Sequence, residues 1–134
     1  MQMGDALQIA SYGMQAQSDR LRVVAENLAN AETTAPAPGV APYQRRLVTF
    51  QNVMDKTLGI PVVKTNYGVD TSAFRQKFDP NHPAADGNGY VLMPNVNSVI
   101  ELTDLREARR GYEANLNVVQ VTRGMLQQTI DLLK

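Results

Sequence analysis

The decisive stretch of the chain is its C-terminal end, Val99 to Lys134, which reads VIELTDLREARRGYEANLNVVQVTRGMLQQTIDLLK. Apolar side chains recur there at alternating steps of three and four residues, with Arg109 and Arg123 occupying two of the positions. This spacing is that of a heptad seam on one face of an α-helix. The apolar positions of this first seam are Leu102, Leu105, Tyr112, Leu116, Val119, Leu126, Ile130 and Leu133.

A second seam runs beside the first. Its positions are Ala114, Val118, Val121, Met125 and Leu132. A helix that is apolar on two faces needs a partner for each of them. An N-terminal helix of the same chain is expected to cover one face, and a neighbouring subunit the other. The alternative is a monomer whose middle segment folds back over the second face.

The N-terminal stretch from Met3 to Ala31 repeats the heptad spacing and contains no proline. Its seam positions are Met3, Leu7, Ala10, Met14, the polar Gln17, Leu21, Val24, Leu28 and Ala31. At about 1.5 Å per residue, such a helix is roughly 40 Å long, which is longer than a small domain is wide. We therefore expect it to project or to lie along a partner.

Glycines weaken both helices. They are Gly4, Gly13, Gly111 and Gly124. Each costs roughly 1 kcal/mol relative to alanine inside a helix, so neither helix is expected to be firm alone, and both are expected to order when they pack. Gly13 and Ala16 would also allow a second helix to approach closely.

Residues 32–98 contain all seven prolines of the chain, which disfavours a long helix there. Runs rich in β-branched and aromatic residues predict two to four short strands. These runs are Arg46–Phe50, Ile60–Lys64, Tyr90–Met93 and Val99–Leu102. The predicted fold is mainly α with a small β and loop insert: two long terminal helices form an antiparallel coiled-coil pair, and residues 1–31 and 99–134 make a helical layer separate from an insert of residues 32–98.

Composition excludes several classes of function. The chain has 134 residues, with 13 Lys and Arg against 13 Asp and Glu, so no field of one sign favours nucleic acid as a partner. The chain has no cysteine, so disulfide bonds and thiolate chemistry are excluded. No stretch approaches the roughly 18 apolar residues of a membrane span, and no direct lipid binding is expected. The N-terminal residues also lack the pattern of a cleaved Sec signal peptide.

An enzymatic or metal-binding function would have to use Asp79, His82 and Asp86, in the segment DPNHPAADGNGY. A small secreted hydrolase or metal-binding domain centred on these residues is the alternative hypothesis. Pro80 and Pro83 favour a stiff turn there over a helix that presents two ligands. The run from Asp86 to Gly89 is more typical of a tight turn before a strand than of a calcium loop. No catalytic, cofactor-binding or metal-ligating residue is therefore assigned.

Asparagines flank the insert. Asn27 and Asn30 are suited to ending a helix, and Asn95 and Asn97 suit the loop before the last helix. The alternative is that these amides bond to backbone across a subunit contact.

Arginines form two small clusters. Arg45 and Arg46 are predicted to mark a strand edge that faces solvent. The helical group of Arg106, Arg109 and Arg110 alternates with acidic residues and is predicted to form pairs within the helix.

Three segments carry a resemblance to a known family: NLANAET at Asn27–Thr33, YQRRLVTF at Tyr43–Phe50 and, most specifically, DPNHPAADGNGYVLMPNVN at Asp79–Asn97. With the terminal helix they span nearly the whole chain, which resembles the bacterial flagellar proximal-rod proteins of the FlgC type, part of the larger family of axial rod and hook subunits. The motif positions are Asn27, Asn30, Asp79, Pro80, His82, Pro83, Asp86, Gly89, Tyr90, Pro94, Asn95 and Asn97.

The resemblance implies a non-enzymatic subunit of the rod that crosses the periplasm. Such a subunit is exported by the flagellar type III apparatus without a cleaved Sec peptide, assembles helically with itself and other rod proteins, and transmits torque from motor to hook. A distal rod or hook subunit is the nearer alternative, but those relatives usually carry larger inserts. The loop ETTAPAPGVAP departs from the family, in which Ser, Thr and Gly are more frequent at that place.

The assembly interface is expected to comprise seam positions that join the two helices to each other and to neighbouring subunits. They are Leu7, Met14, Leu21, Val24, Leu28, Tyr112, Leu116, Val118, Val119, Val121, Met125, Leu126, Ile130, Leu132 and Leu133.

Overall fold

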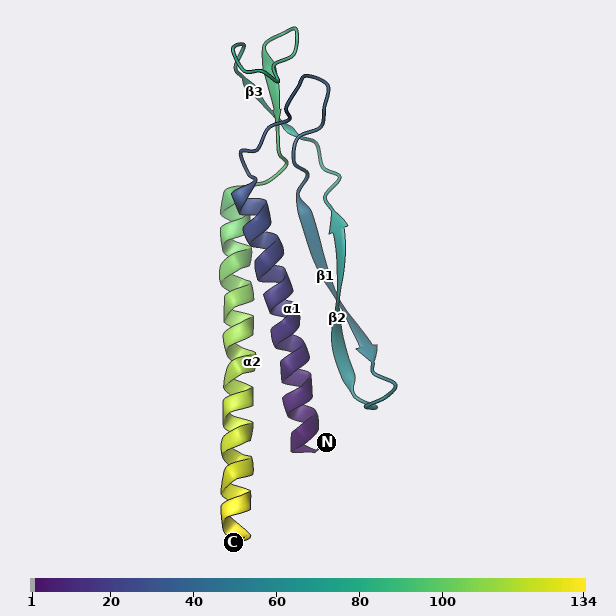
Figure 1. Cartoon of the computed structure of the whole chain (residues 1–134), viewed down its shortest axis with the longest axis vertical. Helices are drawn as coiled ribbons and strands as arrows, with labels where there is room; N and C mark the ends of the chain where they lie inside the picture. The colour runs from purple at the N-terminus through teal and green to yellow at the C-terminus, as the bar shows by residue number, and fades with distance from the viewer. Residues whose placement is uncertain (1) are drawn as a thin grey trace. The chain divides into compact units, whose positions relative to one another are not determined.

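The computed structural model describes residues 2–134. In chain order, one long helix precedes all the strands and another follows them (Figure 1). The elements in chain order are α1 (Met3–Ala29), β1 (Arg46–Met54), β2 (Pro61–Val69), β3 (Arg75–Phe78), β4 (Tyr90–Met93) and α2 (Ser98–Leu132). The strands form two separate two-stranded sheets, β1 with β2 and β3 with β4. The predicted combination of terminal helices and a small strand insert is thus confirmed. Within the described residues, neither helix is apolar enough over a sufficient length to cross a membrane.

Of the four runs predicted as strands, Arg46–Phe50 and Tyr90–Met93 lie in strands, Ile60–Lys64 lies in β2 except for its first residue, and the fourth is wrong. Val99–Leu102 forms the first turn of α2, because Asn97 starts the helix there. The Asn97 side-chain oxygen accepts the N–H of Val99 at 3.0 Å, and its carbonyl accepts the N–H of Glu101 at 3.0 Å. Such an N-cap supplies partners for amides that a first helical turn leaves unpaired.

The contacts divide the chain into two compact units. Unit 1 combines Met1–Leu21, Thr49–Asn66 and Arg106–Lys134, and unit 2 combines Arg22–Val48 and Tyr67–Leu105. Each helix therefore contributes one part to each unit. The predicted division into a terminal helical coiled-coil layer and an insert stays a prediction.

In unit 1 the helices run side by side in opposite directions (Figure 1). A Cβ atom added at Gly13 would lie 2.8 Å from the Asn115 amide nitrogen, and one added at Gly111 would lie 2.9 Å from the amide nitrogen of Gln17. The predicted close approach at Gly13 is confirmed, and its neighbour is α2 of the same chain. In this register, the last turns of α2 extend past the first residues of α1.

A tight turn closes the β1–β2 hairpin in unit 1. The Asp55 carboxylate accepts the N–H groups of Thr57 and Leu58 at 2.8 and 3.1 Å. Gly59 follows at φ 66°, a conformation that glycine adopts without a steric penalty. Ile60, directly after this turn, is buried, at 7% exposure.

The small core of unit 2 includes one face of β4. Val91 and Met93 point inward and pack with Ala84, at 1% and 5% exposure for the two strand residues. Tyr90 on the opposite face pairs with Phe78 of β3 in an edge-to-face arrangement, with ring centroids 5.3 Å apart. The sequence did not predict β3, because its residues Arg75–Phe78 are all exposed and show no alternation.

Candidate functional site

The second seam of α2 is uncovered in this chain. Its exposed fractions are 46% for Val118, 57% for Val121, 51% for Met125 and 87% for Leu132. The alternative in which the middle segment folds over this face therefore does not hold. A continuous apolar stripe at heptad spacing on a helix is a typical surface for packing against another helix.

The first seam lies partly against α1. Tyr112, Leu116 and Val119 are half-buried, whereas Ile130 and Leu133, beyond the start of α1, are exposed. The fully buried positions of α2 in unit 1 are Ala108 and Thr122, which sequence reasoning missed because alanine and threonine give a weak apolar signal. Among the predicted α1 positions, Val24 is buried, and Leu7, Met14, Leu21 and Leu28 are half-buried.

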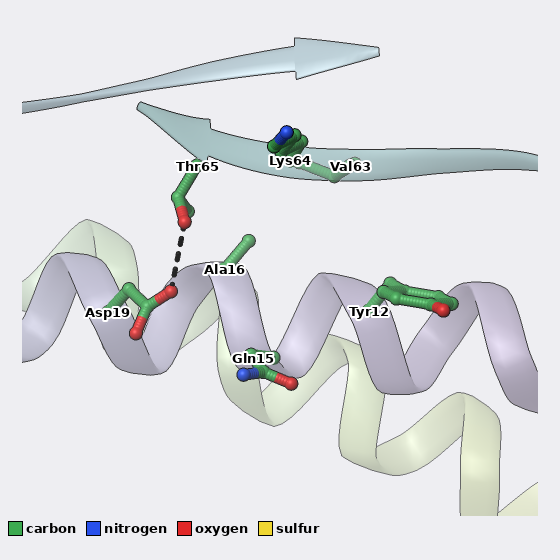
Figure 2. A pocket seen from close by; sticks show the side chains of 7 residues that line it. All are labelled: Tyr12, Gln15, Ala16, Asp19, Val63, Lys64 and Thr65. Carbon is green, nitrogen blue, oxygen red and sulfur yellow. Dashed lines mark hydrogen bonds between the residues drawn. The ribbon is translucent and has the colours of Figure 1, made fainter. Parts of the chain in front are cut away.

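A shallow groove of about 190 Å³ lies between α1 and β2 in unit 1. Figure 2 shows Thr65 pointing from β2 toward Asp19 of α1, with Ala16 beneath the strand. The Thr65 hydroxyl donates to the Asp19 carboxylate at 3.0 Å. This contact joins the hairpin to the helix. The packing of these two elements therefore explains the groove.

A network of polar side chains holds unit 2 together. At its centre is Glu101, whose side chain is fully buried. Its carboxylate accepts hydrogen bonds from the Arg45 guanidinium and, at 3.3 Å, from the Asn27 amide. Arg45 also lies 3.4 Å from carboxylate oxygens of both Asp70 and Asp104. A buried carboxylate is tolerated in a protein only when it is paired in this way.

The prediction of a solvent-facing strand edge at Arg45 and Arg46 is wrong for Arg45, whose side chain is only 19% exposed. Burial alone would lower the pKa of Arg45, but hydrogen bonds and charges from Glu101 and Asp70 more than offset this and raise it. Arg46 is more exposed and pairs with Glu26 of α1 at 2.7 Å.

The prediction that Asn27 ends a helix is wrong, because this residue lies inside α1 and links the helix to the first residue of β1. Its side-chain oxygen accepts the N–H of Arg46 at 2.9 Å, and its amide donates to the Arg46 carbonyl at 2.8 Å. The Tyr43 hydroxyl donates to the same oxygen at 2.8 Å. The pKa of Tyr43 is raised, chiefly by burial and then by the charge of Glu26. In this chain the amide thus bonds to backbone of its own subunit.

The side chains of Asn30 and Asn95 also bond to backbone of their own chain. Asn30 donates to the carbonyl of Glu26 at 2.8 Å and so helps to end α1, as predicted. The Asn95 oxygen accepts the N–H of Arg45 at 2.7 Å, while its amide donates to the carbonyl of Asp70 at 3.0 Å. We call the connected set Asn27, Tyr43, Arg45, Asp70, Asn95 and Glu101 the clasp.

The clasp had a partial signature in the sequence. Glu101 precedes Leu105 and Ala108 by four and seven residues, so it lies on the stripe of α2 that faces α1. A carboxylate at such a position requires a buried partner. The sequence did not indicate that this partner is Arg45.

The segment DPNHPAADGNGY, on which the hydrolase or metal-binding hypothesis depends, forms turns. The N–H of Ala84 donates to Nδ1 of His82 at 3.0 Å, and the other ring nitrogen lies 3.2 Å from the Thr34 hydroxyl. The Asp86 carboxylate accepts the N–H groups of Asn88 and Tyr90, each at 2.9 Å. The predicted tight turn before β4 is confirmed.

Across residues 2–134, no three acidic or histidine side chains are grouped so as to hold a metal ion. Of the helical arginines Arg106, Arg109 and Arg110, Arg109 forms the predicted pair within α2, with Glu113 at 2.9 Å. Glu107 instead pairs with Arg20 of α1 at 3.3 Å.

Comparison with known proteins gives consistent matches. The family model described as "Flagella basal body rod protein" matches residues 7–36, and the one described as "Flagellar basal body rod FlgEFG protein C-terminal" matches residues 88–132. The chain is 51% identical to the flagellar basal-body rod protein FlgC of Agrobacterium fabrum over 130 residues, 96% of this chain and 94% of that protein. It is 37% identical to FlgC of Salmonella typhimurium over 92% of each chain, and 31% identical to FlgC of Borreliella burgdorferi over 100% of this chain and 99% of that protein.

Paired terminal helices with an uncovered apolar face, together with these matches, define a structural protein of the flagellar basal-body rod and not an enzyme. Within that class, the chain belongs to the FlgC family. It is therefore a basal-body subunit that assembles with other rod components. The hypothesis of a hydrolase or metal-binding domain has no support from these relatives.

Proposed function

We propose that the second seam of α2 is the surface through which this subunit joins its neighbours in a helical rod. The observation that carries the proposal is the exposure of Val118, Val121 and Met125 on one helical face. Each Leu, Ile or Val side chain that is buried on assembly contributes roughly 1.5 to 3 kcal/mol. Several such side chains would offset the ordering of glycine-weakened helices.

The finer features of this assembly follow from the same seams. The terminal helices of copies of this chain and of other rod proteins form a coiled-coil inner layer, and α2 beyond the start of α1 lies against a neighbour. The antiparallel register of α1 and α2 within the chain supports this arrangement, as does the exposure of Ile130 and Leu133. A continuous layer of packed helices transmits torque from the motor to the hook.

We further propose that the chain leaves the cytoplasm through the flagellar type III apparatus, without a cleaved Sec peptide, to form the part of the rod that crosses the periplasm. Support comes from the similarity of the chain to flagellar basal-body rod proteins. Helices with internal glycines also unfold readily, as passage in an extended state requires.

Val121→Asp tests the proposed surface, because it places a charge at the centre of the second seam. We expect loss of motility and of intact rods in basal bodies isolated from cells in which this variant replaces the native chain. Gln120→Asp, one residue away on the polar side of α2, is the matched control and should assemble normally. Intact rods with Val121→Asp would overturn the proposal, provided that immunoblotting shows equal amounts of both variants.

A further inference from the structure

The contact between α1 and α2 in unit 1 contains two pairs of a glycine and an amide side chain. The Asn115 amide of α2 lies over Gly13 of α1, and the Gln17 amide of α1 lies over Gly111 of α2. On each helix the two members are four residues apart, about one turn, so both pairs lie on the contacting faces. We call these four residues the glycine–amide lock.

The fit of each amide over its glycine is tight. A Cβ atom added at Gly13 would lie 2.8 Å from Nδ2 of Asn115 and 3.0 Å from both Cγ and Oδ1, so the whole amide group would have to move. The Asn115 amide is also held by its own helix, because it donates to the carbonyl of Gly111 at 3.0 Å. This bond connects the two pairs. A side chain in place of either glycine therefore disturbs a group that is already fixed.

Gln17 lowers the stability of the contact that it occupies. Its side-chain oxygen is buried and has no hydrogen-bond partner within residues 2–134, and such an oxygen destabilises a folded protein. Gln17 is also the polar position in the otherwise apolar seam of α1. In pairs of helices, one polar residue in an apolar seam fixes the register and the choice of partner at a cost in stability. The lock is therefore suited to specificity more than to strength.

Apolar seams alone do not define one register, because they repeat every heptad and fit again after a shift of that length. A shift by one heptad in either direction removes the glycines from beneath both amides. In one direction, Gln17 would face Val118, and Asn115 would face Arg20. A side chain then occupies the space that a glycine leaves open, and overpacking of this kind is destabilising. The lock thus distinguishes the native register from the registers next to it.

We propose that the glycine–amide lock determines which helix α2 accepts as its antiparallel partner, and at which axial offset. It admits α1 of the same chain in one register, and it rejects any helix that presents a larger side chain where Gly13 lies. In a rod built from many similar helices, this selection keeps each α2 paired with its own α1. The lock is separate from the second seam of α2, so the proposal goes beyond the proposed packing surface and does not depend on it.

Exchanging the two members of one pair tests the lock in cells where each variant replaces the native chain. Gly13→Asn alone places two amides in one space and should abolish swimming and intact rods. Gly13→Asn with Asn115→Gly restores one glycine facing one amide and should restore both. Gly13→Asn with Gln120→Gly is the matched control, because it adds the same glycine at an exposed position of α2, and it should not rescue. Normal swimming of Gly13→Asn, or equal rescue by both glycines at equal protein levels, would overturn the proposal.

Cysteine crosslinking in isolated basal bodies measures the register itself, since the chain has no cysteine of its own. Arg20 and Glu107 pair between the helices at 3.3 Å, so a short thiol crosslinker should join Arg20→Cys to Glu107→Cys within one chain. Arg20→Cys with Ala114→Cys reports a shift of one heptad and should react about tenfold less, because a misplaced buried amide costs about that factor or more. Gln17→Leu makes the seam apolar and should lower this ratio. Equal yields in the native lock, a ratio that Gln17→Leu leaves unchanged, or a product that joins two chains would refute the selection.

Discussion

Unit 1 and unit 2 are built from the same two helices, but they pair them through different chemistry. In unit 1, a glycine on each helix faces an amide side chain on the other: Gly13 faces Asn115, and Gly111 faces Gln17. In unit 2, the helices meet at buried Glu101 and Asn27, which also bond to the insert. The first arrangement allows close approach, whereas the second fixes a specific geometry.

Both units leave apolar side chains of α2 on the surface, since Val99 and Ile100 in unit 2 are 72% and 52% exposed. α2 within unit 1 exposes Val118, Val121 and Met125 on one face. The clasp instead satisfies the charges of unit 2 within one chain. A subunit of this kind can fix its geometry within unit 2 and present a surface for neighbours in unit 1. Assembly then adds packing where the single chain has least of it.

The largest effect on stability, and the strongest test of the difference between the two units, is expected from Arg45→Met. The change leaves Glu101 buried without its charged partner, which typically destabilises a protein by about 3 to 5 kcal/mol. Denaturant unfolding monitored by circular dichroism measures this loss. In the double variant Arg45→Met with Glu101→Met, much of the stability should return, because no buried charge remains unpaired. A single variant as stable as the native chain would show that the clasp does not hold unit 2.

A smaller effect is expected from alanine at two glycines of unit 1. The space around Gly124 is open within 4 Å, so Gly124→Ala should increase helix stability by about 1 kcal/mol. Gly13→Ala introduces a Cβ 2.8 Å from the Asn115 amide and should reduce stability despite the better helix propensity. Thermal melts of the two variants, compared in parallel, measure the difference. Equal gains from both would mean that the close approach at Gly13 is not needed.

The sequence predicted the helices well because a heptad pattern is local and repeats many times. The expected stretches, Met3–Ala31 and Val99–Lys134, differ from α1 and α2 by at most two residues at each end. The turn before β4 was also predictable, because Asp86 and Gly89 have the properties that such a turn demands. Similarity to FlgC of other bacteria then supplied the biological role.

The clasp could not be predicted, because its members come from separated segments and no local period relates them. Arg45 next to Arg46 has the same sequence appearance whether it faces solvent or Glu101. Burial distinguishes the two residues, and burial depends on the tertiary fold. The burial of Ala108 and Thr122 could not be predicted for a different reason, since small residues do not mark a helix face by their hydrophobicity.

The smallest effect concerns the clasp at alkaline pH. The pKa of Tyr43 is raised above its usual value of 10.0, mainly by burial, so the folded state retains the phenolic proton more strongly than the unfolded state does. Stability from this group is fully present below about pH 10 and is lost as the pH rises through the raised pKa. Tyr43→Phe removes this dependence, together with one hydrogen bond to Asn27. Denaturant unfolding between pH 8 and pH 11 should therefore show a steeper loss of stability for the native chain than for Tyr43→Phe. Parallel curves for the two proteins would place the phenol outside the clasp.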